Sequence, residues 1–171
     1  MAVPPSAVPP APATAPAAGA GKADLAKRFI AALIDGIIIG IAGMIVGFVP
    51  FIGGPIAGVL VGGYWLMRDG LDLDFADKRS IGKKVMKLRP IRLDGQPMDQ
   101  STSMKRNIPL AIYAIGYFLW IVPVAGHLIS IPIFMIGALI NLMEAILVLT
   151  DAEGRRWGDK MAGTKVIEVA S

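Results

Sequence analysis

Long apolar runs are the feature that most restricts how this chain can fold. Residues 25–49 are apolar except for Lys27, Arg28 and Asp35, and about 20 apolar residues in a helix are enough to cross the hydrocarbon core of a bilayer. Three further apolar runs follow, at residues 51–67, 108–125 and 128–149. With 54% hydrophobic and 18% charged residues, the composition also favours a membrane protein. We therefore predict four transmembrane helices over these four runs.

The breaks between the runs predict that the helices form two hairpins. Pro50 and the Gly-Gly-Pro sequence at residues 53–55 interrupt the first pair of helices. A tight turn around Gly126 and His127 is expected to separate the second pair, with His127 exposed to solvent or capping the turn.

The basic residues predict the orientation of these helices. Of the 17 lysines and arginines, three precede or open the first run, ten lie in residues 68–107 and four lie in residues 150–171. Neither hairpin turn contains one. Because positive charge is retained on the cytoplasmic side, we expect both termini, the loop 68–107 and the tail 150–171 in the cytoplasm. The predicted fold class is an all-α membrane protein with four transmembrane helices.

The polar segments are expected to form a small cytoplasmic cap. Ile81, Val85 and Leu88 recur at helical spacing beside lysines, which predicts a short amphipathic helix. Residues 88–97 and 164–170 each have the pattern of a strand, the first running into an Asp-Gly turn, and we predict that they pair as a two-stranded ribbon.

Residues 1–22 are rich in proline and alanine. Such a segment cannot form a packed core, so we expect a disordered cytoplasmic tail followed by one folded domain over residues 23–171.

The reactive residue types are scarce. The chain has no cysteine and a single histidine, which excludes disulfides and thiolate metal sites. It also lacks the sequence patterns of common hydrolases, zinc proteases and nucleotide-binding loops. We therefore expect no enzymatic activity, no metal and no cofactor.

Four segments carry a resemblance to a known family. They are KRFIAALID, SIGKKVMKLRPIRLDG, SMKRNIP and RRWGDKMAGTKVI, and together they resemble the RDD family of bacterial membrane proteins, which is named for one arginine and two aspartates. The resemblance implies that these motif residues are Arg28, Asp35 and Asp159. Many members carry a histidine before the last aspartate, where this chain has Gly158. The resemblance also implies a multi-pass protein of the bacterial inner membrane, and transport, including cation/proton exchange, has been suggested for some members.

Asp35 is the candidate functional residue within the apolar runs. Arg28 lies seven residues earlier, which places it about 10 Å away along the helix axis, so the two side chains cannot pair directly. A carboxylate at this depth must be protonated, paired or facing water. One interpretation is a structural clamp in which Arg106 reaches Asp35. The other is a proton or cation site that Asp35 forms with Glu144 at a similar depth, with Asn141 one turn deeper on the same face.

Asp159 follows the last apolar run and is expected on the cytoplasmic side. We interpret it as an electrostatic latch: its carboxylate accepts a hydrogen bond from Arg28 or Arg106, and this contact holds the tail over the helix ends. The alternative is an ordinary turn-forming aspartate.

The loop carries a run of basic residues suited to anionic lipid headgroups on the cytoplasmic side, each contributing about 1 kcal/mol near such a surface. They are Lys78, Arg79, Lys83, Lys84 and Lys87. Nucleic acid is not an expected partner, since few aromatic residues lie among these charges.

Small residues recur along the first two runs, at positions 36, 40, 43 and 47 and at positions 54, 58 and 62, all of them glycine. They predict close packing within the hairpin or a seam between two copies in a homo-oligomer. The expected function is transport of a cation, proton or small solute. The alternative is a non-catalytic accessory or scaffold subunit of a larger membrane complex.

Overall fold

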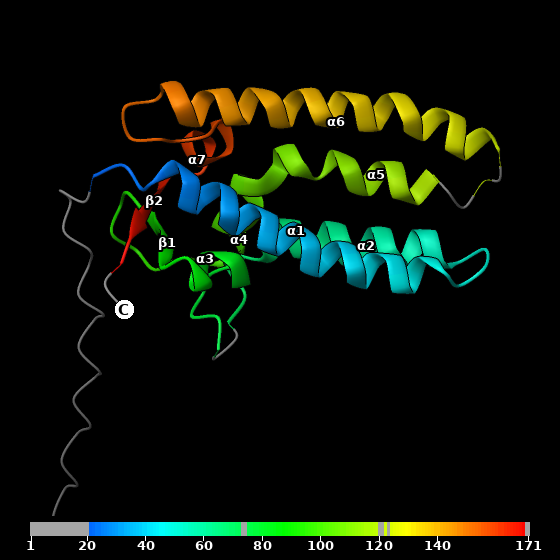
Figure 1. The fold of residues 1–171 in the computed structure, drawn as a ribbon, viewed down its shortest axis with the longest axis horizontal. Coiled ribbons are helices and arrows are strands. Elements are labelled where there is room, and N and C mark those ends of the chain that lie inside the picture. The colour runs from blue at the N-terminus through cyan, green and yellow to red at the C-terminus, as the bar shows by residue number, and fades with distance from the viewer. Residues whose placement is uncertain (1–20, 73–74, 120–121, 123, 170–171) are drawn as a thin grey trace, which may run out of the picture.

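The computed structural model describes residues 21–72, 75–119, 122 and 124–169, and most of these residues are helical. Four helices lie along one another and form a bundle (Figure 1). Their bounds are α1 Leu25–Gly47, α2 Gly53–Met67, α5 Ile112–Phe118 and α6 Ala125–Thr150. The segment predicted to be disordered falls almost entirely outside the described residues.

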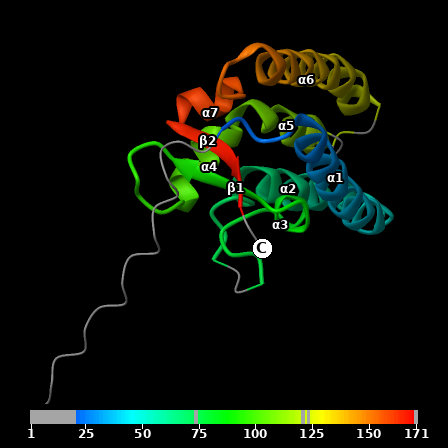
Figure 2. The same ribbon diagram turned by 60° about the vertical axis from the view of Figure 1, so that its left-hand side comes forward.

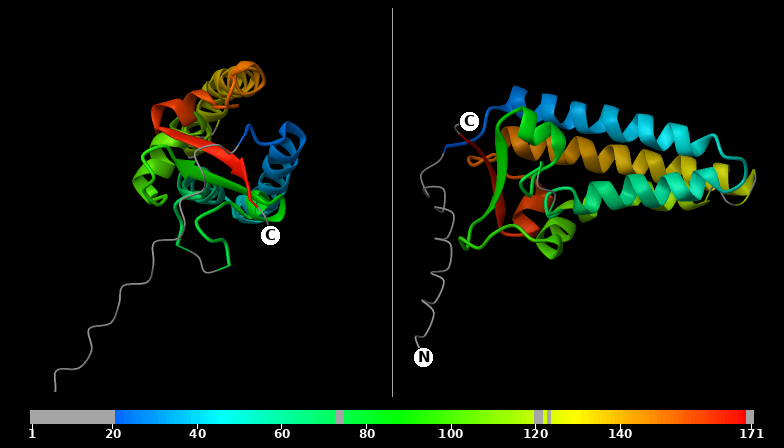
Figure 3. Two further views of the ribbon diagram at one scale, coloured as in Figure 1. Left: turned by 90° about the vertical axis from the view of Figure 1, so that its left-hand side faces the viewer. Right: turned by 90° about the horizontal axis from the view of Figure 1, so that it is seen from below.

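A small cap closes one end of the bundle, opposite the turn between α1 and α2 (Figure 3). Its elements are α3 Ile81–Val85, β1 Leu88–Arg92, α4 Gln100–Asn107, α7 Trp157–Met161 and β2 Thr164–Glu168. The cap is therefore built from the loop and the tail that were predicted to lie together.

Two of the helices are long and apolar enough to cross a membrane. They are α1, with 23 residues, and α6, with 26 residues. The apolar helix α2 is shorter, with 15 residues. The chain thus contains two candidate membrane-spanning helices in its described part.

The third predicted segment, residues 108–125, is not one continuous helix. It begins as the short 3-10 helix η1 at Ile108–Leu110 and continues as α5 at Ile112–Phe118. Pro109 has no backbone N–H to donate, which explains the irregular start. The predicted turn at Gly126 and His127 is also wrong, because α6 begins at Ala125 and both residues lie in its first turn.

The predicted ribbon is confirmed. Strands β1 and β2 pair antiparallel, with Leu88 opposite Glu168 and Pro90 opposite Val166, and the ribbon lies between α3 and α7 (Figure 2). Leu88 and Val166 are buried against Ala31 of α1. The ribbon therefore forms the small apolar core under the first turns of α1.

The predicted amphipathic helix is shorter than expected. Helix α3 has only five residues, and its first turn is capped by the Ser80 hydroxyl, which accepts from the backbone N–H of Lys83. Lys87 then adopts a left-handed conformation, so Leu88 lies in β1 instead of on the helix. A side chain at Gly82 would collide with the carbonyl oxygen of Ala31. Glycine at this position lets α3 lie directly against α1.

Candidate functional site

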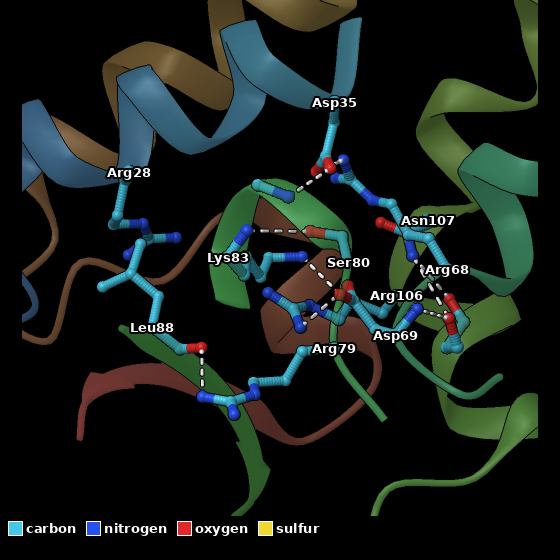
Figure 4. Close-up of polar contacts among 12 residues, drawn as sticks. Arg28, Asp35, Arg68, Asp69, Arg79, Ser80, Lys83, Leu88, Arg106 and Asn107 are labelled. Atoms are coloured by element: carbon cyan, nitrogen blue, oxygen red, sulfur yellow. Dashed lines mark hydrogen bonds and ion pairs between the residues drawn. The ribbon is translucent and has the colours of Figure 1, made fainter. Parts of the chain in front are cut away.

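Asp35 is fully buried where the bundle meets the cap. Its carboxylate accepts three hydrogen bonds, from Arg68 Nη1 at 3.1 Å, from Tyr64 Oη at 2.9 Å and from the backbone N–H of Gly82 at 2.8 Å. Figure 4 shows Arg68 and the α3 backbone converging on it. The basic partner of Asp35 is therefore Arg68, at the end of α2, and not the Arg106 that the clamp interpretation named.

Asp69, the next residue, is a second fully buried carboxylate. It accepts from Lys83 Nζ, and from Arg106 Nη1 at 3.1 Å. Burial alone would raise the pKa of Asp69, but the neighbouring charges of Lys83, Arg106 and Arg68 outweigh it and hold the pKa below its ordinary value. Asp69 is therefore ionised at neutral pH and joins α3 to α4.

Asp159 is the third buried carboxylate and connects the tail to the rest of the cap. It accepts from Arg106 Nε at 2.6 Å, from Arg28 Nη2 at 3.3 Å and from the backbone N–H of Arg156 at 3.1 Å. Burial alone would raise its pKa, yet Arg106, Arg156 and Arg28 together lower it below the ordinary value. This is the contact pattern that the latch interpretation requires.

Arg106 lies between two of these carboxylates and is 1% exposed. Its guanidinium contacts Asp69 through Nη1 and Asp159 through Nε, a two-sided arrangement for which arginine is well suited. The basic residue that opens the third apolar segment therefore links the end of α2 to the tail.

Glu144 lies on α6 and has its own partners. It accepts from the backbone N–H of Gly158 at 3.0 Å and lies 3.5 Å from Arg156 Nε. A side chain at Gly158 would collide with the carbonyl oxygen of Arg106, so glycine is required for this close contact of α7 with α4. Asn141, one turn earlier on α6, donates to Tyr113 Oη at 2.7 Å. Glu144 thus holds α7 to α6.

The residues expected at lipid headgroups occupy different environments. Lys84 and Lys87 are exposed, whereas Lys78 and Arg79 are half-buried. Lys83 is buried in its ion pair with Asp69, so it is not on the exposed surface of the cap as the prediction requires. The prediction is therefore corrected for Lys83, whose neighbours in sequence gave no sign of its buried partner.

A cavity of about 340 Å³ lies between α1 and α6 at this charged junction, and we call it the basic cavity. Its lining includes five basic and two acidic side chains, namely Arg28, Arg68, Lys83, Arg106, Arg156, Asp35 and Glu144. Asp35 and Glu144 therefore line the same cavity, but each carboxylate has a different arginine as its partner.

The charges around the basic cavity do not balance. With Asp69 and Asp159 included, the cluster contains five basic and four acidic side chains, a formal excess of one positive charge. Arg28 and Arg156 are half-buried, and the other seven are buried. Arg68 is 5% exposed, and its Nε has no hydrogen-bond partner among the described residues. Those residues also include no group of three or more acidic, histidine or cysteine side chains placed to hold a metal ion. The arrangement is suited to an anion.

The comparison with family models identifies the family of this chain. The model of the RDD family matches residues 22–163, which is most of the chain and contains the whole charged cluster. No curated protein and no solved structure matches the chain.

Proposed function

The chain belongs to the RDD family, and from this premise we propose a non-enzymatic, multi-pass protein of the bacterial inner membrane that binds a small anionic solute for transport. The observation that carries the proposal is the basic cavity between α1 and α6, whose lining contains five basic and two acidic side chains.

The surface of the bundle supports a membrane location. Residues 36–67 and 107–143 contain no lysine, arginine, aspartate or glutamate. Large apolar side chains are exposed along the bundle and around the turn opposite the cap, where Phe51 is 88% exposed. An apolar surface of this extent is unusual in a soluble monomer and is expected against lipid.

We propose that all four bundle helices cross the membrane, with the cap and both termini in the cytoplasm. Helix α2 is about 22 Å long, shorter than a hydrocarbon core of about 30 Å. The exposed apolar residues Val49, Phe51 and Ile52 of the adjoining turn extend its apolar length, and local thinning of the bilayer can accommodate the rest.

Single introduced cysteines test this topology, because the natural chain has none. Gln96→Cys places a thiol in the cap, and Ile52→Cys places one in the turn at the opposite end. A membrane-impermeant maleimide should label the first only from the cytoplasmic side and the second only from the other side. Labelling of both positions from one side would contradict the proposed crossing of α1 and α2.

The charge arrangement favours an anion over a cation or a proton as the solute. A cation would compete with arginines that already lie beside both carboxylates. Asp35 binds Arg68, and Glu144, whose Oε2 has no hydrogen-bond partner among the described residues, lies 3.5 Å from Arg156 Nε through that oxygen. An anion, in contrast, would compensate the excess positive charge and accept from the unpaired Nε of Arg68.

Binding of inorganic phosphate to the delipidated protein in a neutral detergent tests the proposal. A ligand at ten times its dissociation constant stabilises the folded state by about 1.4 kcal/mol. We therefore expect a saturable rise in unfolding temperature with phosphate that chloride at equal ionic strength does not reproduce. Arg68→Gln should remove the rise, because it removes the excess charge, while Asp35 keeps Tyr64 and Gly82 as donors.

The matched control is Arg92→Gln, which removes an arginine of the cap that does not line the basic cavity. This variant should respond to phosphate as the natural chain does. An equal response of the natural chain to phosphate and chloride would refute anion binding in the cavity.

An accessory role in a larger membrane complex is the second candidate. Helix α6 presents a row of exposed apolar residues, Leu128, Met135, Leu139, Leu142 and Leu149, that no other described part of the chain covers. Extraction in a mild detergent followed by mass determination distinguishes the two roles. A stable complex with a different protein would favour the accessory role.

A further inference from the structure

A second, apolar cavity adjoins the basic cavity and has a volume of about 660 Å³. It runs along α1 past Gly36, Gly40 and Gly47, with Trp65 of α2 and Tyr117 of α5 on the other sides. Asn141 lines both cavities, and on α1 the lining passes directly from Asp35 to Gly36. The charged and the apolar spaces are therefore neighbours at the same junction of helices.

The glycines of α1 leave this space open. A Cβ added to Gly36, Gly40 or Gly47 would have no other atom within 4 Å, whereas one added to Gly43 would meet the side chain of Val61 at 2.8 Å. The glycines of α2 behave differently, since Gly58 and Gly62 lie against Tyr117 and Ala114. Of α1 and α2, it is therefore α2 that uses its glycines chiefly for packing against another helix.

The length of the apolar cavity matches the depth of one leaflet. From Gly36 to Gly47, α1 rises by about 16 Å, which is about half of a hydrocarbon core of about 30 Å. The basic cavity lies at the capped end of this stretch, where the proposed topology places the lipid headgroups. A molecule that filled both spaces would need an anionic head and a hydrocarbon chain.

We propose that the two cavities together bind one anionic phospholipid of the cytoplasmic leaflet, with its phosphate in the basic cavity and an acyl chain along the glycines of α1. This inference rests on the proposed function and specifies its ligand. An anionic head compensates the excess charge of the cluster. The acyl chain moves from the apolar bilayer interior into an apolar cavity and gains little free energy by doing so. The headgroup therefore determines which phospholipid is bound.

Competition between two phospholipids tests the inference. The full-length protein is purified into nanodiscs with equal amounts of phosphatidylglycerol and phosphatidylcholine, transferred to a neutral detergent, and examined by native mass spectrometry for retained lipid. We expect one retained lipid per chain, with about a fivefold preference for phosphatidylglycerol, which is ~1 kcal/mol at 1.4 kcal/mol per tenfold. Equal retention of the two lipids would overturn the inference.

Two variants separate the head from the tail of the ligand. Arg68→Gln should abolish the preference between the two lipids. Gly40→Leu should fill the apolar cavity and abolish retention of both. Its matched control is Gly63→Leu on α2, a position that is equally open but does not line the apolar cavity. Retention by Gly40→Leu at the level of Gly63→Leu would also overturn the inference.

The other possible occupant, a helix of a second copy, gives a different result. A dimer without bound lipid that Gly40→Leu dissociates would replace the lipid inference. The proposed function is tested separately from the lipid inference. Gly40→Leu leaves the basic cavity intact, so this variant should still respond to inorganic phosphate. A response to phosphate without any lipid preference would reject the lipid and leave the anion site standing.

Discussion

The substitution Asp159→Asn tests most directly whether buried ion pairs hold the cap on the bundle. Asparagine keeps the shape of the side chain but removes the charge toward which Arg28, Arg106 and Arg156 converge. Arg106 keeps its contact with Asp69. Arg28 keeps only the carbonyl oxygen of Gly154.

The size of the effect follows from these remaining contacts. Breaking a buried ion pair by removing one partner costs about 3–5 kcal/mol. Because Arg106 and Arg156 retain other carboxylates, we expect the lower end, about 3 kcal/mol. At 1.4 kcal/mol per tenfold, this corresponds to a rise of about 100-fold in the equilibrium constant for detachment of the tail.

Hydrogen exchange of the backbone amides in residues 164–169 measures this detachment, since these residues form β2 and its extension against β1. The matched control is Asp94→Asn, which removes an aspartate from an ion pair with Arg92 in the same cap. Its side chain is 51% exposed, so the rate of exchange should change by less than about fivefold. If hydrogen exchange in Asp159→Asn also differs from that of the natural chain by less than about fivefold, the latch interpretation is refuted.

Three further predictions follow from the same junction. The pKa values of Asp69 and Asp159 are lowered in the folded state, so their stabilisation is complete above the ordinary aspartate value of 3.8 and is lost as the pH falls below it. Acid unfolding monitored by tail proteolysis should therefore begin below about pH 4, and an onset near pH 6 would contradict this assignment. Gly82→Ala should lower the unfolding free energy by about 1–3 kcal/mol, because the added methyl group would collide with α1. Thermal unfolding measures this loss, with Gly63→Ala as the control. Equal stability of the two variants would argue against the close contact of α3 with α1. Tyr64→Phe removes one of the three hydrogen-bond donors to Asp35 and should lower the unfolding free energy by about 1.5–3 kcal/mol in the same assay. An unchanged stability would show that the Tyr64 hydroxyl group does not donate to Asp35.

Local patterns in the sequence were sufficient to predict much of the fold. The apolar runs predict α1, α2 and α6, since helix formation in an apolar environment depends on hydropathy and length. The ribbon follows from alternation and from the Asp94-Gly95 turn, where Gly95 adopts a positive φ. The irregular third segment could also have been predicted, because Pro109 lies one residue inside it.

The partners of the buried charges could not be predicted in the same way. Arg68 is 33 residues from Asp35 and Asp159 is 53 residues from Arg106, so these pairs exist only once α2, α4 and the tail have packed. The one local signal was the spacing of Tyr64 and Arg68, which places both on one face at the end of α2. The burial of Lys83 could not be predicted, because the neighbouring Lys84 and Lys87 have the same kind of sequence context and are exposed.

The distribution of the carboxylates bears on the choice between a proton carrier and an anion site. Asp35 connects α1 to α2 and α3, Asp159 connects α7 to α4 and α1, and Glu144 connects α6 to α7. If any of them took up a proton in each transport cycle, it would lose an ion pair that holds the cap in place. Proton transport would then weaken the attachment of the cap in every cycle. Binding an anion to the basic wall of the cavity makes no such demand, because it adds a negative charge beside the basic side chains and leaves every carboxylate contact intact.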